Sequence, residues 1–239
     1  MSAFEFIISR DSGVARIDLN RPEQGNTLTR AMMVQLALTL RQLGNDPAIH
    51  VVALEGRGEA FCLGRDGKGE SRSGMTPYEI RVTMMGAVLD VYQAIADVPV
   101  PVVALVHADA LGFGAATAVG CDITLAAHSA RFAFPEIEHD IPPTMAMCAA
   151  IGKVQAKALT YLIYSAESIS ATQAVTLGLA SKVIASERFA AEATSFLNTL
   201  AGRPRLVLET IKRYQTRAAH LSPEMASEYA GTLLALVRS

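Results

Sequence analysis

The sequence predicts an α/β core followed by a helical C-terminal region. Apolar, β-branched runs that are typical of strands alternate with segments of helical spacing up to about residue 140. After Pro142 the apolar residues follow helical spacing almost throughout. Hydrophobic residues make up 51% of the 239 residues, which is enough to form a large core. We therefore expect an α/β core over residues 1–140 and a helical region over residues 141–239.

Five strands are expected in the core, and strand–helix–strand repetition of this kind favours right-handed crossovers. The predicted strands are Phe4–Ser9, Val14–Leu19, Val51–Glu55, Val102–Val106 and Ile123–Ala126.

Two helices are expected between these strands. The first begins after Thr29, a residue type that caps helix N-termini, and runs to about Leu43. The second begins near Thr76, with Pro77 at its first position, and runs to Ala96.

The C-terminal region is expected to be helical, with one short strand at Lys182–Ile184 and no other. The predicted helical segments are 144–164, 170–178, 186–201, 204–218 and 223–238.

Composition excludes several classes of partner. The net charge is −2, and acidic and basic residues are mixed along the chain, whereas nucleic-acid or membrane binding needs a concentrated basic face. The N-terminus lacks the features of a signal peptide, and no apolar run reaches the roughly 18–20 residues that span a bilayer. Cys62, Cys121 and Cys148 form no metal-binding spacing, so we expect no metal and a reducing, cytoplasmic location.

Two glycine turns follow predicted strands. Gly64 lies in the turn Phe61–Asp66, and Gly112 opens a run of small residues suited to a tightly packed helix. Glycine lets backbone N–H groups point into a cavity, and two such turns can converge on one oxygen as an oxyanion hole. Both glycines could equally be simple turn residues. A dinucleotide fingerprint is disfavoured, because Thr117 holds its third glycine position.

Glu136 is the candidate acid/base. It lies in the apolar stretch Phe134–Asp140, where partial desolvation would raise the pKa of its carboxyl group. The alternative is a surface residue before a helix. Glu138, His139 and Asp140 are further candidates for a second proton carrier, with Asp140 ahead, although acidic residues here are more often helix caps.

Other polar and sulfur-containing residues are expected to be structural. His107 follows a buried strand and is expected to be hydrogen-bonded in the core, and Asp122 is also expected to form structural hydrogen bonds. Cys62 and Cys121 are expected to be small buried residues.

Five segments, taken in order from Leu19 to Ile184, resemble the enoyl-CoA hydratase/isomerase (crotonase) superfamily. They are LNRPEQGNTLTRAM, GRGEAFCLGRDGKG, PVPVVALVHADALGFGAATAVGCDITLAA, ARFAFPEIEHDIPP and ISATQAVTLGLASKVI. The resemblance implies a spiral of ββα units with a C-terminal helical region used for trimer formation. It also implies a homotrimer or a dimer of trimers.

The resemblance also implies roles for single residues. The backbone N–H groups of Arg65 and Phe113 match the oxyanion donors, and Glu136 matches one of two catalytic glutamates. It further implies an acyl-CoA substrate, of which coenzyme A is a part, so no separate cofactor is expected. The residues expected to contact coenzyme A or the acyl group are Leu63, Arg65, Asp66, Gly67, Lys68, Gly112 and Phe113.

The sequence departs from the hydratase pattern in ways that bear on the reaction. Ala116 stands where the second hydratase glutamate is expected, and Asp140 replaces a glycine. Hydration uses two groups on one water, whereas one carboxylate can in principle run a double-bond isomerisation. We therefore expect an enolate-stabilising isomerase, with hydratase activity as the first alternative. A hydrolase or decarboxylase on the same fold and a non-catalytic acyl-CoA-binding protein are further alternatives.

Overall fold

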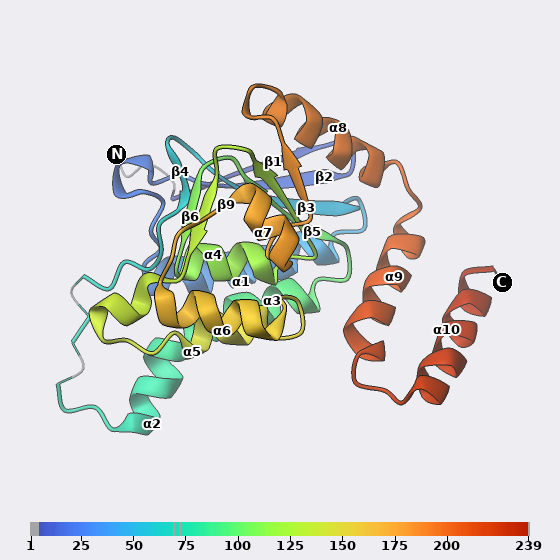
Figure 1. Ribbon diagram of the computed structural model, residues 1–239. Coiled ribbons are helices and arrows are strands. Elements are labelled where there is room, and N and C mark those ends of the chain that lie inside the picture. Colours follow the sequence, from blue (N-terminus) through green and yellow to red (C-terminus); the bar gives the residue numbers. More distant parts are fainter. Residues whose placement is uncertain (1–4, 69, 72, 239) are drawn as a thin grey trace.

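The strands form two sheets in the computed structural model of the chain, which describes residues 5–68, 70–71 and 73–238 (Figure 1). The larger sheet has six strands in the order β1-β2-β3-β5-β7-β10, and all of its pairs except β1–β2 are parallel. Its strands are β1 (Phe6–Asp11), β2 (Val14–Leu19), β3 (Val51–Gly56), β5 (Val102–Val106), β7 (Ile123–Ala127) and β10 (Lys182–Ile184).

The smaller sheet has four strands in the order β4-β6-β8-β9. Its strands are β4 (Ala60–Cys62), β6 (Asp109–Leu111), β8 (Arg131–Ala133) and β9 (Ile169–Ser170). In chain order β3, β5 and β7 of the larger sheet are each followed by one strand of the smaller sheet and then by a helix. This is a repetition of ββα units, and it confirms the predicted α/β class.

The predicted strands of the larger sheet are confirmed with small changes in their bounds. β1 extends to Asp11 because it forms a hairpin with β2 through Ser12 and Gly13, whose φ angles are 48° and 83°. Phe4, the first residue of the predicted strand, lies outside the described residues. Lys182–Ile184 forms β10 as predicted.

The smaller sheet was not predicted. The expectation of no other strand after Pro142 is wrong, because Ile169–Ser170 pairs with β8. Strands of two or three residues are too short for apolar alternation to be visible in the sequence.

The predicted helices are also confirmed, with two changes. The helix predicted from Thr76 runs in three parts, which are α2 (Pro77–Glu79), a π-helical segment (Ile80–Met85) and α3 (Gly86–Asp97). The helix predicted over 144–164 is two helices, because Gly152, with a φ of 79°, lies between them. The α-helices other than α2 and α3 are α1 (Arg30–Asn45), α4 (Phe113–Gly120), α5 (Thr144–Ala150), α6 (Ala156–Ser165), α7 (Ala171–Leu177), α8 (Phe189–Ala201), α9 (Arg205–Ala218) and α10 (Pro223–Arg238).

Both faces of the larger sheet are covered, which explains why β3 is apolar along most of its length. Val52 and Leu54 face the main core with α1 and α3, whereas Val51 and Ala53 face a second apolar cluster with α8. The four side chains are fully buried. Helix α8 therefore closes the face of the sheet that α1 and α3 leave open (Figure 1).

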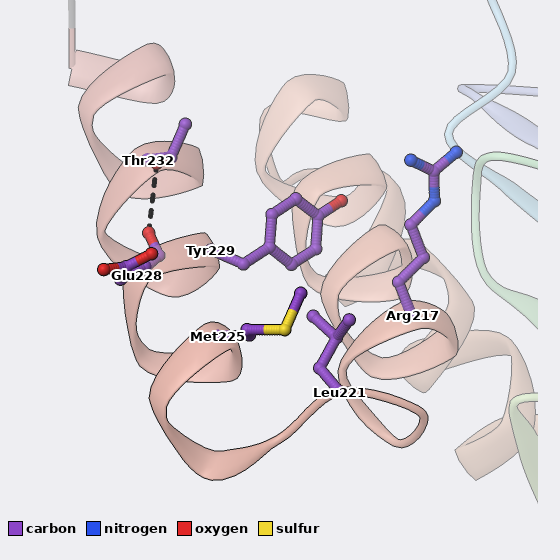
Figure 2. Close-up of a pocket in the computed structure, with 6 residues that line it drawn as sticks. All are labelled: Arg217, Leu221, Met225, Glu228, Tyr229 and Thr232. Carbon is purple, nitrogen blue, oxygen red and sulfur yellow. Dashed lines mark hydrogen bonds between the residues drawn. The ribbon is translucent and has the colours of Figure 1, made fainter.

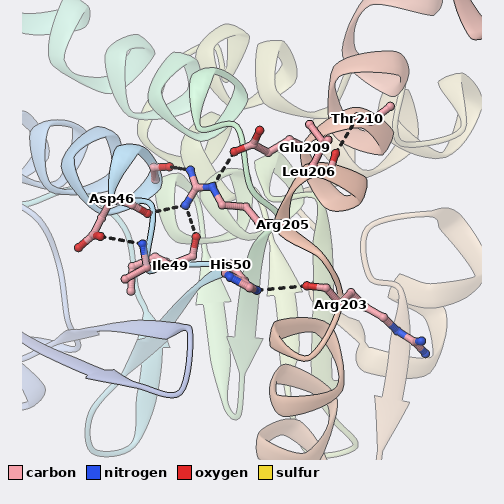
Figure 3. Close-up of polar contacts among 10 residues, drawn as sticks. Asp46, Ile49, His50, Arg203, Arg205, Leu206, Glu209 and Thr210 are labelled. Carbon is pink, nitrogen blue, oxygen red and sulfur yellow. Dashed lines mark hydrogen bonds and ion pairs between the residues drawn. The ribbon is translucent and has the colours of Figure 1, made fainter. Parts of the chain in front are cut away.

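The C-terminal hairpin α9–α10 stands beside this body and is attached to it by the partly buried Arg205 and the buried Lys212 (Figure 1). The guanidinium of Arg205 donates to the carbonyl oxygens of Gly44 and Asp46 at the end of α1 and of Ile49 in the loop that follows (Figure 3). Lys212, which is 4% exposed, forms an ion pair of 2.7 Å with Asp122. Among the described residues, no helix is both long and apolar enough to cross a membrane.

Candidate active site

A cavity of about 400 Å³ lies where both predicted glycine turns meet α3, α5 and the segment that carries Glu136. Its walls are mostly apolar, with a few polar groups, as is typical of small-molecule sites. The lining residues are Leu63, Gly64, Arg65, Gly67, Glu70, Val88, Tyr92, Gly112, Phe113, Pro135, Glu136, His139, Ile141, Met145 and Ala146.

The first glycine turn follows β4 and directs the N–H of Arg65. Leu28 pairs with Arg65 in an isolated parallel bridge, in which the N–H of Leu28 donates to Gly64 and the N–H of Asp66 donates to Leu28. In this pattern the N–H of the central residue points away from the paired strand. We find no acceptor for the Arg65 N–H among the residues that the structure describes.

The second glycine turn connects β6 to α4. Gly112 has a φ of 51° and a ψ of −118°, a conformation that favours glycine, and its N–H donates to Ala133 at 2.9 Å. Phe113 is the first residue of α4, so its N–H has no carbonyl partner within the helix. Within the described chain it also has no other acceptor.

Gly114 brings the start of α4 against the end of β4. A Cβ atom at this position would lie 2.1 Å from the carbonyl oxygen of Cys62, which is closer than real atoms approach. The absence of a side chain therefore lets the second turn pack directly on the first. Gly64 contacts the second turn as well, since a Cβ there would lie 3.6 Å from the carbonyl oxygen of Leu111.

Glu136 lies beside the second turn, in a 3-10 helix spanning Pro135–His139. One of its carboxylate oxygens, Oε1, is 3.1 Å from the place that a Cβ of Gly112 would take. The other oxygen, Oε2, is buried and has no hydrogen-bond partner among the described residues. Burial raises the pKa of the Glu136 carboxyl group above the ordinary value of a glutamate. The site thus holds a desolvated carboxylate next to unpaired N–H groups.

Tyr92 and Glu70 line the same cavity and were not predicted. Tyr92 stacks on Phe113, with ring centroids 5.9 Å apart, and Glu70 forms an ion pair with Arg65. Tyr92 lies one helical turn after Val88 on α3, so the two side chains lie on the same face of the helix. Helical spacing of this kind is shared by residues that pack in a core and by residues that line a cavity. The sequence therefore held no signal that separated the two.

The residues predicted to contact coenzyme A are brought together only in part. Leu63, Arg65 and Gly67 line the cavity, whereas Asp66 and Lys68 do not. The carboxylate of Asp66 pairs with Arg21 at 3.0 Å and accepts the N–H of Lys68 at 3.1 Å. The hydrogen bond from Lys68 and the pairing with Arg21 lower the pKa of Asp66, so this carboxylate holds the turn in shape.

The candidates for a second proton carrier separate in the same way. All three side chains are exposed, and of the three only His139 lines the cavity. Asp140 ends the 3-10 helix with a φ of 55°, and its N–H donates to Ile137 at 3.1 Å. Ala116 is fully buried in the main core and does not line the cavity.

The predicted structural roles of Asp122, Cys62 and Cys121 are confirmed, whereas His107 is hydrogen-bonded as predicted but is half-buried rather than in the core. Asp122 accepts the N–H of Val102 at 2.8 Å and pairs with Lys212. A ring nitrogen of His107 lies 2.9 Å from the carbonyl oxygen of Gly58. Both Cys62 and Cys121 are buried.

A second hollow, also of about 400 Å³, lies in the C-terminal hairpin between α9 and α10 (Figure 2). Its lining includes Arg217, Leu221, Met225 and Tyr229. The ring of Tyr229 stacks on that of Tyr214 at 6.1 Å. This hollow lacks the combination of unpaired N–H groups and a desolvated carboxylate that marks the first cavity.

Comparisons with known proteins agree with this geometry. Residues 9–234 match the family described as enoyl-CoA hydratase/isomerase. The chain is 30% identical to the 2,3-dehydroadipyl-CoA hydratase of Escherichia coli (strain K12), over 94% of this chain and 87% of that protein. It is 32% identical to the 1,2-epoxyphenylacetyl-CoA isomerase of the same organism, over 87% and 81% of the two chains.

A solved structure gives the same result for the fold. The crystal structure of an enoyl-CoA hydratase from Mycobacterium smegmatis superposes with a TM-score of 0.91 at 30% identity, covering 97% of this chain and 90% of that one. This agreement confirms the spiral α/β fold that the sequence resemblance implies.

Proposed function

Because the chain belongs to the enoyl-CoA hydratase/isomerase (crotonase) superfamily, we propose that its cavity binds an acyl-CoA thioester and moves a double bond along the acyl group. Acyl-CoA substrates are what membership of this superfamily implies. In this proposal the backbone N–H groups of Arg65 and Phe113 hold the thioester oxygen, and Glu136 moves the proton. Leu63, Gly67, Gly112 and the neighbouring Asp66 and Lys68 form the surroundings of coenzyme A.

One observation carries the proposal. Oε1 of Glu136 lies against Gly112, the residue that directly precedes the unpaired N–H of Phe113. An oxygen bound at that N–H would therefore bring the adjacent carbon atoms of the acyl group close to the carboxylate. The oxygen becomes negatively charged when a proton leaves the α carbon, and fixed N–H donors stabilise such charge best where water is excluded.

The proton transfer balances with a single carboxylate. Glu136 removes a proton from C2 of a 3-enoyl thioester, and the electron pair moves into the thioester carbonyl to form a dienolate. The protonated Glu136 then returns the proton to C4. The double bond now lies between C2 and C3, and the carboxylate is regenerated. Burial, which raises the pKa of Glu136, suits a group that must both accept and release a proton.

Isomerisation is favoured over hydration because of residue 116. Hydration needs a water that is aligned and deprotonated by positioned groups, and alanine offers neither a hydrogen bond nor a proton. Ala116 is fully buried and lies outside the cavity lining, so no polar atom of this residue reaches a substrate water.

Hydration is the second candidate, and His139 favours it. Its side chain lines the cavity three residues after Glu136 and could share a water with that carboxylate. Two relatives also differ in reaction, since one is described as a hydratase and the other as an isomerase.

Comparing two substrates of equal chain length tests the proposal. We expect the purified protein to convert a 3-enoyl-CoA to the 2-enoyl-CoA faster than it hydrates the 2-enoyl-CoA. Isomerisation forms a conjugated thioester and hydration removes one, so ultraviolet absorbance follows both reactions. Product chromatography identifies what each reaction forms. Fast hydration without isomerisation would reverse the order of the two candidates. Binding of both thioesters without turnover would indicate a non-catalytic acyl-CoA-binding protein.

A further inference from the structure

Tyr92 lines the cavity, and the proposed reaction does not use its hydroxyl group. The residue lies on α3, its ring stacks on Phe113 at an interplanar angle of 25°, and it lines the same cavity as Glu136. Phe113 is the residue whose N–H is proposed to hold the thioester oxygen. A group that reaches from this N–H past Glu136 therefore passes close to the ring of Tyr92.

The hydroxyl of Tyr92 is a donor in need of an acceptor. Within the described residues it forms no hydrogen bond, either with Glu136 or with any other group. Val88 and Ala146 line the same cavity and offer no side-chain acceptor. Tyrosine hydroxyls at binding sites normally form a hydrogen bond, and a bound ligand can supply the acceptor that the described residues do not.

The ionisation state of Tyr92 fixes its role as a donor. Burial is the main cause that raises its pKa, and the nearby carboxylate of Glu136 raises it further. The other titratable groups that line the cavity with Tyr92 are Arg65, Glu70 and His139. The phenol therefore stays protonated over the whole working range of an enzyme, so it can offer a hydrogen but cannot act as a base.

We propose that Tyr92 is a specificity-determining residue whose hydroxyl donates a hydrogen bond to an oxygen carried by the acyl group, so that the cavity selects oxygen-substituted acyl thioesters over plain alkyl ones. This inference rests on the proposed function, because it takes the thioester to bind at Phe113. It deepens that function by naming the substrate class. Short acyl groups with a hydroxyl at the third or fourth carbon match the small cavity.

Calorimetric binding of matched thioesters tests the proposal. Butyryl-CoA, 3-hydroxybutyryl-CoA and 4-hydroxybutyryl-CoA differ by one oxygen atom and its position. They are titrated into the native chain, Tyr92→Phe and Tyr164→Phe. Tyr92→Phe keeps the ring that stacks on Phe113 and removes only the oxygen. Tyr164→Phe is a matched control, since Tyr164 is 75% exposed on α6 and away from the cavity lining. The titrations are repeated in a Glu136→Gln background, where turnover cannot alter the ligand.

We expect the native chain to bind at least one hydroxybutyryl-CoA about threefold to tenfold more tightly than butyryl-CoA, the usual effect of one neutral hydrogen bond. Tyr92→Phe should lose this preference while its affinity for butyryl-CoA stays unchanged, and Tyr164→Phe should keep it. The proposal is overturned if the native chain shows no preference, if Tyr92→Phe retains one, or if Tyr92→Phe weakens all three thioesters equally. Failure of the native chain to bind any of them would instead refute the proposed function, and this inference with it.

Discussion

Glu136 is the side chain on which the proposed reaction depends. Replacing it with glutamine keeps its size and removes its ability to exchange a proton. We expect Glu136→Gln to lower the rate of isomerisation by roughly 100-fold or more, the usual contribution of a general acid/base, with little effect on thioester affinity. Glu138→Gln is the matched control, because Glu138 lies two residues later in the same 3-10 helix but is exposed.

The pH dependence of the native chain is part of the same prediction. Glu136 must be ionised to accept the first proton, and burial raises its pKa in the folded chain. Activity should therefore fall as the pH drops through this raised pKa, at a higher pH than an ordinary glutamate would give. Steady-state rates between pH 4 and pH 8 measure this loss of activity on the acid side, the acid limb of the pH–rate profile. A Glu136→Gln protein with near-native rates, or with the same acid limb, would dismiss the assignment.

Helix α4 is the element that joins the two glycine turns, and Gly114 is its closest point of contact with β4. A methyl group at residue 114 would overlap the carbonyl oxygen of Cys62, which is backbone and cannot rotate away. Gly114→Ala should cost about 3 kcal/mol of stability, in the upper part of the range for overpacked sites, and should lower activity by separating the turns.

Gly120→Ala at the other end of α4 is the control for this prediction. A Cβ there meets only the side chains of Ala149 and Ile95, each at 3.9 Å, so stability should stay within about 1 kcal/mol of native. Urea denaturation together with the isomerase assay measures both effects. Equal stability and activity of the two variants would show that the close approach at residue 114 does not form the site.

The strands of the two sheets differ in how well the sequence predicts them. β3 and β5 are apolar over most of their length and are buried on both faces, so composition was enough to identify them. β2 was recognisable because its buried apolar residues alternate with Arg16 and Asp18. The strands of the smaller sheet have two or three residues, and they are set by their neighbours rather than by their own pattern.

Of the residues in the candidate site, the sequence also identified some and missed others. Gly64, Gly112 and Glu136 are recognisable because a positive φ angle and a carboxylate in an apolar stretch are local properties. Tyr92 is not, because only the packing of α3 decides that its ring lies in a cavity rather than in the core. Asp140 was favoured for departing from a glycine, yet it caps the 3-10 helix from the surface. Whether Asp140 takes part in catalysis stays a prediction.

The C-terminal hairpin bears on how whole chains assemble. It is fixed to the body through Arg205 and Lys212, so it presents its outer surface in one orientation. Leu206, Ile211 and Leu234 on α9 and α10 are 53%, 52% and 58% exposed. Large apolar side chains left open on attached helices favour association.

We expect the chain to form a homotrimer or a dimer of trimers through this hairpin, because association would remove these apolar side chains from water. Light scattering of the full chain at micromolar concentration should then give three or six times the mass of one chain. Leu234→Glu should shift the mass toward the monomer, since a buried unpaired charge opposes association. Ser227→Glu is the control, because Ser227 is an exposed polar residue on the same helix, and it should leave the assembly intact. A native chain that stays monomeric would refute the prediction, and loss of assembly in both variants would show that added charge, rather than the apolar contact, separates the chains.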